Sequence, residues 1–169
     1  AEVILKEDFK DLKAWKALRF PLVRKASDYQ AVALASGPAL KAHCRASASA
    51  LLWTRTFDPK AFPVLSWIWR VDKVFSQADG RRLKGDDYPL RLYVNFAYDP
   101  GLATRATRIK YNAARAVYGQ YPPWASLNYA WASQDQGPDF FPSPFASQVR
   151  VLALRFGLPG PGVWLKERR

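Results

Sequence analysis

The chain has 169 residues, of which 49% are hydrophobic, and a formal net charge of +12. This length supports one substantial hydrophobic core, so we expect a single domain over residues 1–169. The positive charge favours anionic partners such as acidic proteins, acidic glycans, anionic lipid surfaces or nucleic acid. The basic residues are scattered rather than gathered in one run, and we therefore expect no nucleic-acid partner.

Several classes of protein are excluded by what the sequence lacks. Cys44 is the single cysteine, so an internal disulfide and a cysteine-based zinc cluster are impossible. No apolar run approaches the roughly 18 residues of a transmembrane helix, although peripheral membrane contact stays open. The chain has no methionine and begins with alanine. Removal of a signal peptide leaves such a start, so we expect a periplasmic or extracellular location.

Alternating and short apolar segments between turn residues predict an all-β protein, an antiparallel β-sandwich. A tight turn is expected at Ser36, Gly37 and Pro38, and Pro89 is expected to open a strand. The expected strands cover residues 2–6, 17–20, 29–36, 39–45, 50–57, 64–71, 90–98, 126–132, 148–155 and 163–165.

One segment, residues 104–118, has a helical period instead. Its apolar row is Ala106, Ile109, Ala113 and Ala116, and its basic face carries Arg105, Arg108 and Arg115. Thr104 is a suitable N-cap and Gly119 a suitable C-terminal stop. Either this is a crossover helix that packs its apolar row on the sandwich, or its basic face docks on an acidic partner or an anionic membrane.

Four of the strands carry one polar row each, because successive side chains point to opposite faces. If these strands share a sheet, the rows form one patch of Arg70, Arg91, Tyr93, Asn95, Asn128, Gln148 and Arg150. Such a mixture suits the hydroxyls and carboxylates of a glycan. The alternative interpretation is an ordinary solvated sheet face with cross-strand pairs.

Asp86 and Asp87 are adjacent at a predicted turn, which raises the question of a metal or catalytic site. Neighbouring residues of an extended segment point apart, so the two acids cannot form a catalytic pair by themselves. They are expected to bond turn amides and nearby basic groups, with a structural cation as the minority alternative. No cofactor motif is present, and His43 is the single histidine. We therefore expect no catalytic residues and no cofactor.

Two loops are rich in proline and aromatic residues, at 121–124 and 137–145. Such loops are expected to be ordered. They either cap one end of the core or contact a ligand or partner.

The chain resembles the bacterial exported family known as domain of unknown function 3047. The resemblance covers nearly the whole chain and rests on the blocks EDFKDLKAWKALRFP, PVLSWIWRVDKV, KGDDYPLRLYVNFAYDP, YGQYPPWASLNYAWAS, SQVRVLAL and GVWLKERR. It implies a secreted or periplasmic sandwich similar to jelly-roll carbohydrate-binding modules, with no catalytic residues to transfer. It also implies a further acidic segment and strand after Arg169, so either the sandwich lacks a C-terminal strand or the protein is naturally short.

Two functions of different classes follow. The first is a non-catalytic accessory protein, a subunit of a larger cell-envelope or membrane-associated complex, held on an acidic partner by its basic surface and aromatic loops. The second is a carbohydrate-binding module that recognises an anionic or hydroxyl-rich glycan through the polar sheet face. A glycan hydrolase or lyase is a distant third.

Overall fold

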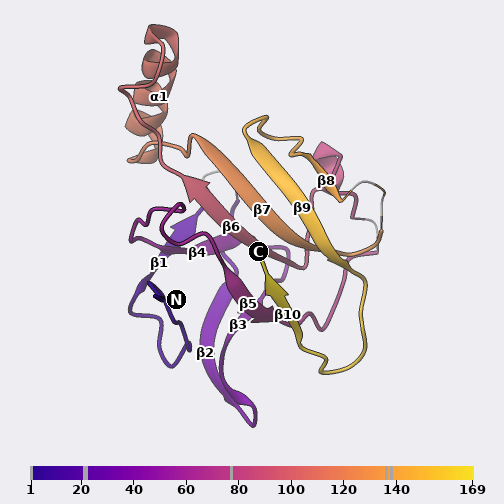
Figure 1. Cartoon of the computed structure of the whole chain (residues 1–169). Coiled ribbons are helices and arrows are strands. Elements are labelled where there is room, and N and C mark those ends of the chain that lie inside the picture. The colour runs from indigo at the N-terminus through magenta and orange to yellow at the C-terminus, as the bar shows by residue number, and fades with distance from the viewer. Residues whose placement is uncertain (1, 21–22, 77, 136, 138) are drawn as a thin grey trace. The chain divides into compact units, whose positions relative to one another are not determined.

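The computed structural model describes residues 2–20, 23–76, 78–135, 137 and 139–169, and it is mostly β with one α-helix (Figure 1). Its elements are β1 (Trp15–Arg19), β2 (Asp28–Leu34), β3 (Gly37–His43), β4 (Ser49–Trp53), β5 (Ser66–Trp69), the 3-10 helix η1 (Leu83–Gly85), β6 (Leu90–Phe96), α1 (Arg105–Tyr118), β7 (Ala125–Ala132), β8 (Phe140–Pro142), β9 (Val149–Phe156) and β10 (Leu165–Arg168). The all-β fold with one substantial helix is confirmed.

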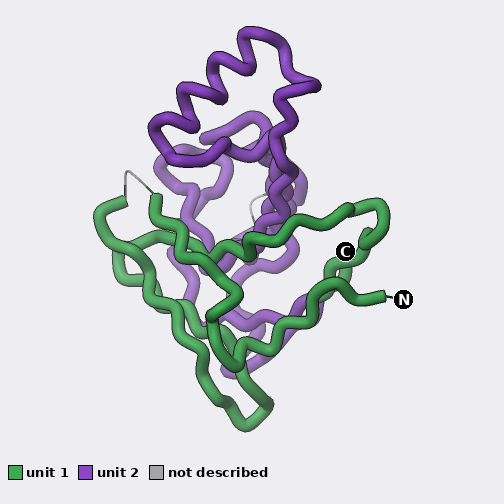
Figure 2. Tube along the Cα trace, turned by 90° about the vertical axis from the view of Figure 1, so that its left-hand side faces the viewer, with its two compact units in different colours: residues 1–66, 168–169 green, residues 67–167 purple. Residues whose placement is uncertain are grey.

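The chain forms two compact units, residues 1–66 with 168–169 and residues 67–167 (Figure 2). The first unit contains two antiparallel pairs, β1 with β4 and β2 with β3. A tight turn joins β2 to β3 as expected, but it lies at Ala35 and Ser36, so Gly37 and Pro38 begin β3. Gly37 has a positive φ of 117°, which a residue with a Cβ adopts only with strain. The Tyr29 hydroxyl donates to the Ser49 carbonyl over 2.6 Å and so connects β2 to β4.

The second unit contains a four-stranded sheet in the order β6-β7-β9-β8. The pairs β6–β7 and β8–β9 are antiparallel, but β7 and β9 are parallel, with a register shift between Ala130 and Trp131. The sheet is therefore mixed, where the alternation of side chains had led us to expect antiparallel strands alone. Strands β5 and β10 pair with each other in a separate two-stranded sheet.

Aromatic side chains fill the space between these two sheets. Trp69 meets Trp131 at a ring-centroid distance of 5.5 Å, and Trp67 meets Tyr129 at 5.1 Å. Trp69 and Trp131 are buried, whereas Ile68, between the two β5 tryptophans, is largely exposed. The alternation in β5 was thus predicted correctly, and the two facing sheets make this unit a sandwich.

Buried indoles need hydrogen-bond acceptors, and Glu167 of β10 provides one. Its carboxylate accepts from Trp69 Nε1 over 3.2 Å and from Arg155 Nε over 2.6 Å. Glu167 is only 3% exposed, so these donors take the place of water around its side-chain oxygens. Trp131 Nε1 donates instead to the Gly157 carbonyl over 2.8 Å. These bonds fix the two tryptophans that form the core.

The expected strands differ clearly from the observed ones at three places, and one is the last strand, which is Leu165–Arg168 where residues 163–165 were expected. Residues 2–6 do not form a strand, because their short alternation provides no buried row and Val3 remains exposed. Strand β8 was missed inside a proline-rich segment that was expected to be a loop. It is a short edge strand, where the missing N–H of Pro142 is tolerated. Within that segment, Pro138 lies outside the described residues.

The Glu167 network leads to a stability prediction. The Glu167→Ala variant should lose about 2–3 kcal/mol of unfolding free energy, since Trp69 loses a buried acceptor and Arg155 loses its counter-charge. Urea unfolding followed by tryptophan fluorescence measures this loss. Lys166→Ala, at the exposed neighbouring position, is the matched control and should change the free energy by less than about 0.5 kcal/mol. Equal stability of the two variants would contradict the role of Glu167.

Candidate functional site

The polar rows of β6 and β7 lie on one face of the four-stranded sheet. In their antiparallel register Tyr93 is opposite Asn128, and Asn95 is opposite Ser126. Asn128 Nδ2 donates to the Tyr93 hydroxyl over 3.2 Å, and the Ser126 hydroxyl donates to Asn95 Oδ1 over 2.7 Å. This part of the expected patch is therefore assembled, and its members hydrogen-bond to each other.

The remaining expected patch residues lie elsewhere. The parallel register places Val151 beside Asn128, and Arg150 beside Leu127 on the opposite face. Arg70 follows β5, which belongs to the other sheet, where it pairs with Asp72 over 2.9 Å. Gln148 directly precedes β9 and lies near α1, as described below. The prediction of one patch of seven residues is therefore wrong, and these residues lie in separate places. Alternation does not reveal strand order or register, which decide where the residues lie.

Arg91 is held within the chain by its neighbours. Its guanidinium lies 3.3 Å from a carboxylate oxygen of Asp86 and 4.9 Å from the centre of the Tyr88 ring. It also lies 6.0 Å from the centre of the Tyr93 ring. An arginine paired with a carboxylate and packed between two aromatic rings is well ordered. Its Nη1 is the nitrogen that bonds to Asp86.

The two acids of the turn have different environments. The Asp86 side chain is only 8% exposed, whereas Asp87 is exposed and its backbone N–H donates to the Gly85 carbonyl. Burial raises the pKa of Asp86, and the nearby Arg91 guanidinium opposes that rise. No group of three His, Cys, Asp or Glu side chains in the described part of the chain is placed to hold a metal ion. Asp86 serves as the partner of Arg91, as expected of a turn anchor.

Buried polar atoms accompany this pair. Asn128 is 1% exposed, and its Oδ1 has no hydrogen-bond partner among the described residues. The Tyr88 hydroxyl is also buried and has no partner within the same residues, and burial raises the pKa of Tyr88. Burial raises the pKa of Tyr93 as well. The β7 side of this face, with Asn128 and Ser126, is therefore buried, whereas Tyr93, at 43% exposed, and Asn95 on β6 remain open to solvent.

The helix α1 has the expected caps. The Thr104 side chain accepts from the Thr107 N–H over 3.2 Å, and Gly119 is left-handed, with φ of 74°. Arg105, Arg108 and Arg115 are exposed, and among the described residues none of them forms an ion pair. The expected basic face is therefore present and open to solvent.

The expected packing of α1 on the sandwich is wrong. The helix extends away from the sheet of its own unit and lies against none of the described strands (Figure 1). Its apolar row, with Ile109 64% exposed, faces solvent. Tyr111 is the one buried residue of the helix. Alternation and helical period define an apolar row, but they do not say which element covers it.

Aromatic contacts fasten α1 at its base. Tyr111 stacks on Tyr98 with ring centroids 4.0 Å apart, and its hydroxyl donates to the Pro123 carbonyl over 3.1 Å. Trp124 stacks on the same Tyr98 at 5.7 Å, and its backbone N–H donates to the Phe96 carbonyl over 2.9 Å. The aromatic base, Tyr98, Tyr111, Tyr121 and Trp124, joins α1 to the ends of β6 and β7.

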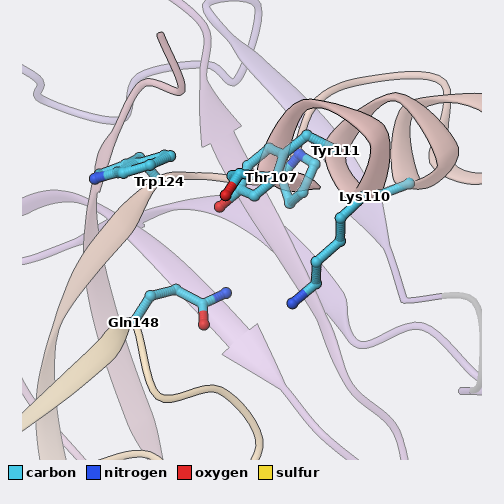
Figure 3. Close-up of a pocket in the computed structure, with 7 residues that line it drawn as sticks. Thr107, Lys110, Tyr111, Trp124 and Gln148 are labelled. Carbon is cyan, nitrogen blue, oxygen red and sulfur yellow. The ribbon is translucent and has the colours of Figure 1, made fainter. Parts of the chain in front are cut away.

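A cavity of about 170 Å³ lies beside this aromatic base (Figure 3). Its lining residues are Thr107, Lys110, Tyr111, Ala114, Pro122, Trp124 and Gln148. Gln148 belongs to the residues predicted for ligand binding, while Lys110, Thr107 and Tyr111 were missed. The aromatic loop that contains Trp124 was the available signal, since it was expected either to cap the core or to contact a ligand.

The Asp86 environment leads to a prediction about titration. Carboxyl NMR should give Asp86 a pKa above its ordinary value of 3.8. The Arg91→Gln variant should raise that pKa further, because the opposing guanidinium is removed. Because the pKa of Asp86 is higher in the folded protein than in the unfolded chain, protonation of Asp86 stabilises the fold. This contribution to the free energy of unfolding is fully present below the ordinary carboxyl pKa and is lost as the pH rises through the raised pKa. A pKa at or below the ordinary value, unchanged in the variant, would contradict the arrangement.

Comparison with known proteins gives one match. The model of a family described as a protein of unknown function, DUF3047, matches residues 13–169. The search of curated proteins and the search of solved structures each found no match. In the described part of the chain, no helix has the length and apolar character needed to cross a membrane.

Proposed function

We propose that this chain, which belongs to the DUF3047 family of unknown function, is a non-catalytic accessory protein that docks on an acidic protein through α1. The observation that carries the proposal is the exposure of this helix. It stands away from its sheet, with a basic arc and an apolar arc both facing solvent. The proposed setting is a larger complex of the cell envelope, outside the cytoplasm.

The charge of α1 supports an anionic partner. The helix sequence RATRIKYNAARAVY has four basic residues and no acidic one. Arg105 and Arg108 lie near the N-terminus, where the helix dipole makes a positive charge unfavourable by about 0.3–1 kcal/mol. Such a local cost is typical of positions that serve an interaction rather than the fold. A carboxylate-rich surface would offset it.

The apolar arc favours a protein over a lipid surface. It consists of Ala106, Ile109, Ala113, Ala116 and Val117, all of them exposed. Small residues allow a close approach of another backbone, whereas interfacial membrane helices insert bulky Trp, Phe and Leu side chains. Combined with the arginines beside it, the arc fits a partner that has a small apolar patch bordered by acidic residues.

The polar sheet face gives weaker support to the alternative, a carbohydrate-binding module. Arg91 is paired with Asp86, and Asn128 donates to Tyr93 within the chain. A sugar would compete with these internal bonds at Arg91 Nη1 and at the Asn128 amide.

Site-specific photo-crosslinking in the native cell tests the docking surface. A photo-reactive residue at Ile109 should capture one acidic protein, because this position lies in the middle of the exposed arc. The same residue at Val64, which is also exposed, is the matched control and should not capture that protein. Capture from Val64 alone, or of no protein from Ile109, would contradict the proposal.

The affinity for the captured protein tests the charges. The triple variant Arg105→Gln, Arg108→Gln, Arg115→Gln should bind it about tenfold more weakly, from the loss of three exposed ion pairs. Higher salt should weaken wild-type binding by screening the same pairs. The control triple variant, Arg24→Gln, Lys41→Gln, Arg45→Gln, removes equal charge from exposed positions and should bind normally.

Three results would contradict this account. If both triple variants lost affinity equally, binding would depend on the net charge of the protein rather than on the surface of α1. Full retention in the α1 variant would exclude the basic face. The third result would be tight binding of the wild-type protein, but not of the α1 variant, to vesicles of anionic phospholipid. That result would show that α1 docks on a membrane and not on a protein.

A further inference from the structure

The cavity beside the aromatic base has a lining that the docking function does not use. It lies where the start of β9 and the loop before β7 meet the inner face of α1. In Figure 3, the side chains of Lys110 and Gln148 extend toward one another, with Trp124 beside them. An apolar wall with a few convergent polar groups is the usual composition of a small-molecule site.

Trp124 provides a fixed aromatic wall. Its backbone N–H donates a hydrogen bond to the Phe96 carbonyl, and its ring stacks on Tyr98. Even so, 43% of the residue is exposed. A tryptophan that is immobilised before binding loses little entropy when a ligand packs on it. The C–H face of a sugar ring is a suitable partner, because it is apolar and flat while its hydroxyls point outward.

The polar groups of the cavity define the rest of the ligand. Lys110 contributes a positive charge, and none of the seven lining residues is acidic. The Gln148 amide can both donate and accept, and so can the Thr107 hydroxyl. This set matches one carboxylate next to several hydroxyls. The lining has one cationic side chain and no arginine fork, which suits the single charge of a carboxylate.

The cavity is a small, partly open depression that suits one ring. Sites for drug-sized molecules have about 300–1,000 Å³, whereas this one has about 170 Å³, and its lining residues Lys110, Trp124 and Gln148 are exposed. A single pyranose with its carboxylate fits such a space better than a nucleotide or a longer oligomer. The rest of a chain would lie outside the cavity.

We infer that this cavity binds one uronic-acid unit of an acidic polysaccharide. The Trp124 indole packs on the C–H face of the pyranose, Lys110 pairs with the carboxylate, and Gln148 and Thr107 bond to hydroxyls. This site is distinct from the polar sheet face, and it does not depend on docking through the arginines of α1.

Isothermal titration calorimetry with trigalacturonate as the probe tests the inference. Wild-type protein should bind it saturably, and the methyl-esterified trisaccharide, which lacks the negative charges, should bind about tenfold more weakly. Lys110→Gln should reduce trigalacturonate affinity by about tenfold and abolish the preference for the charged form. Trp124→Ala should reduce the affinity for both trisaccharides by about tenfold, from the lost ring contact.

Matched variants make the test decisive. Lys41→Gln removes an exposed lysine far along the chain, and Phe145→Ala removes an exposed loop aromatic, and both should bind as wild type does. Trp124→Ala also removes the ring contact to Tyr98, so the fold of this variant is checked by circular dichroism. Lys110 is exposed, so Lys110→Gln tests the site without removing that ring contact.

Two results would overturn the inference. The first is no saturable heat from trigalacturonate at millimolar concentration. The second is unchanged affinity in both Lys110→Gln and Trp124→Ala. The α1 triple arginine variant should still bind the trisaccharide, so failure of the docking proposal and failure of this one are separable.

Discussion

The stack of Tyr111 on Tyr98 is the contact on which the proposed surfaces depend. The two ring centroids are 4.0 Å apart, and Tyr111 is the one buried residue of α1. Because the helix is held along a single face, its arginines and its apolar arc stay open to solvent. The same contact places Lys110 opposite Gln148 and so forms the cavity wall. The aromatic base therefore accounts for both the exposed face of α1 and the cavity beside the helix.

The polar groups of the second unit divide into two kinds. Some form ion pairs within the unit, as Arg91 does with Asp86 at β6 and Arg155 does with Glu167 in the core. Those on α1 are not matched by carboxylates within the described residues. Internal pairs contribute to order and stability, whereas exposed unpaired charges contribute mainly to association. This division is why we place function at the helix rather than on the sheet.

Local features were predictable from the sequence, because they depend on neighbouring residues. The caps of α1 at Thr104 and Gly119, the turn before Gly37 and the inward row of β5 all follow from propensity or alternation. The same holds for the outer arginines of the helix. These positions required no knowledge of the fold.

Long-range features were not predictable in the same way. The parallel pairing of β7 with β9 places Arg150 on the wrong face for the expected patch. The separate pairing of β5 with β10 removes Arg70 from it. Alternation assigns the side chains of a strand to its two faces. It does not show the order of the strands in the sheet or which element packs on each face. The cavity was missed for this reason, since Lys110 and Gln148 are brought together only by the fold.

Amide hydrogen exchange of the native complex, compared with the isolated protein, tests the central claim most directly. If α1 is the docking surface, the amides of residues 105–118 should exchange more slowly in the complex, because binding suppresses local opening of an otherwise exposed helix. The β2–β3 pair should exchange at the same rate in both states. Protection confined to β2 and β3, with α1 unchanged, would contradict the account.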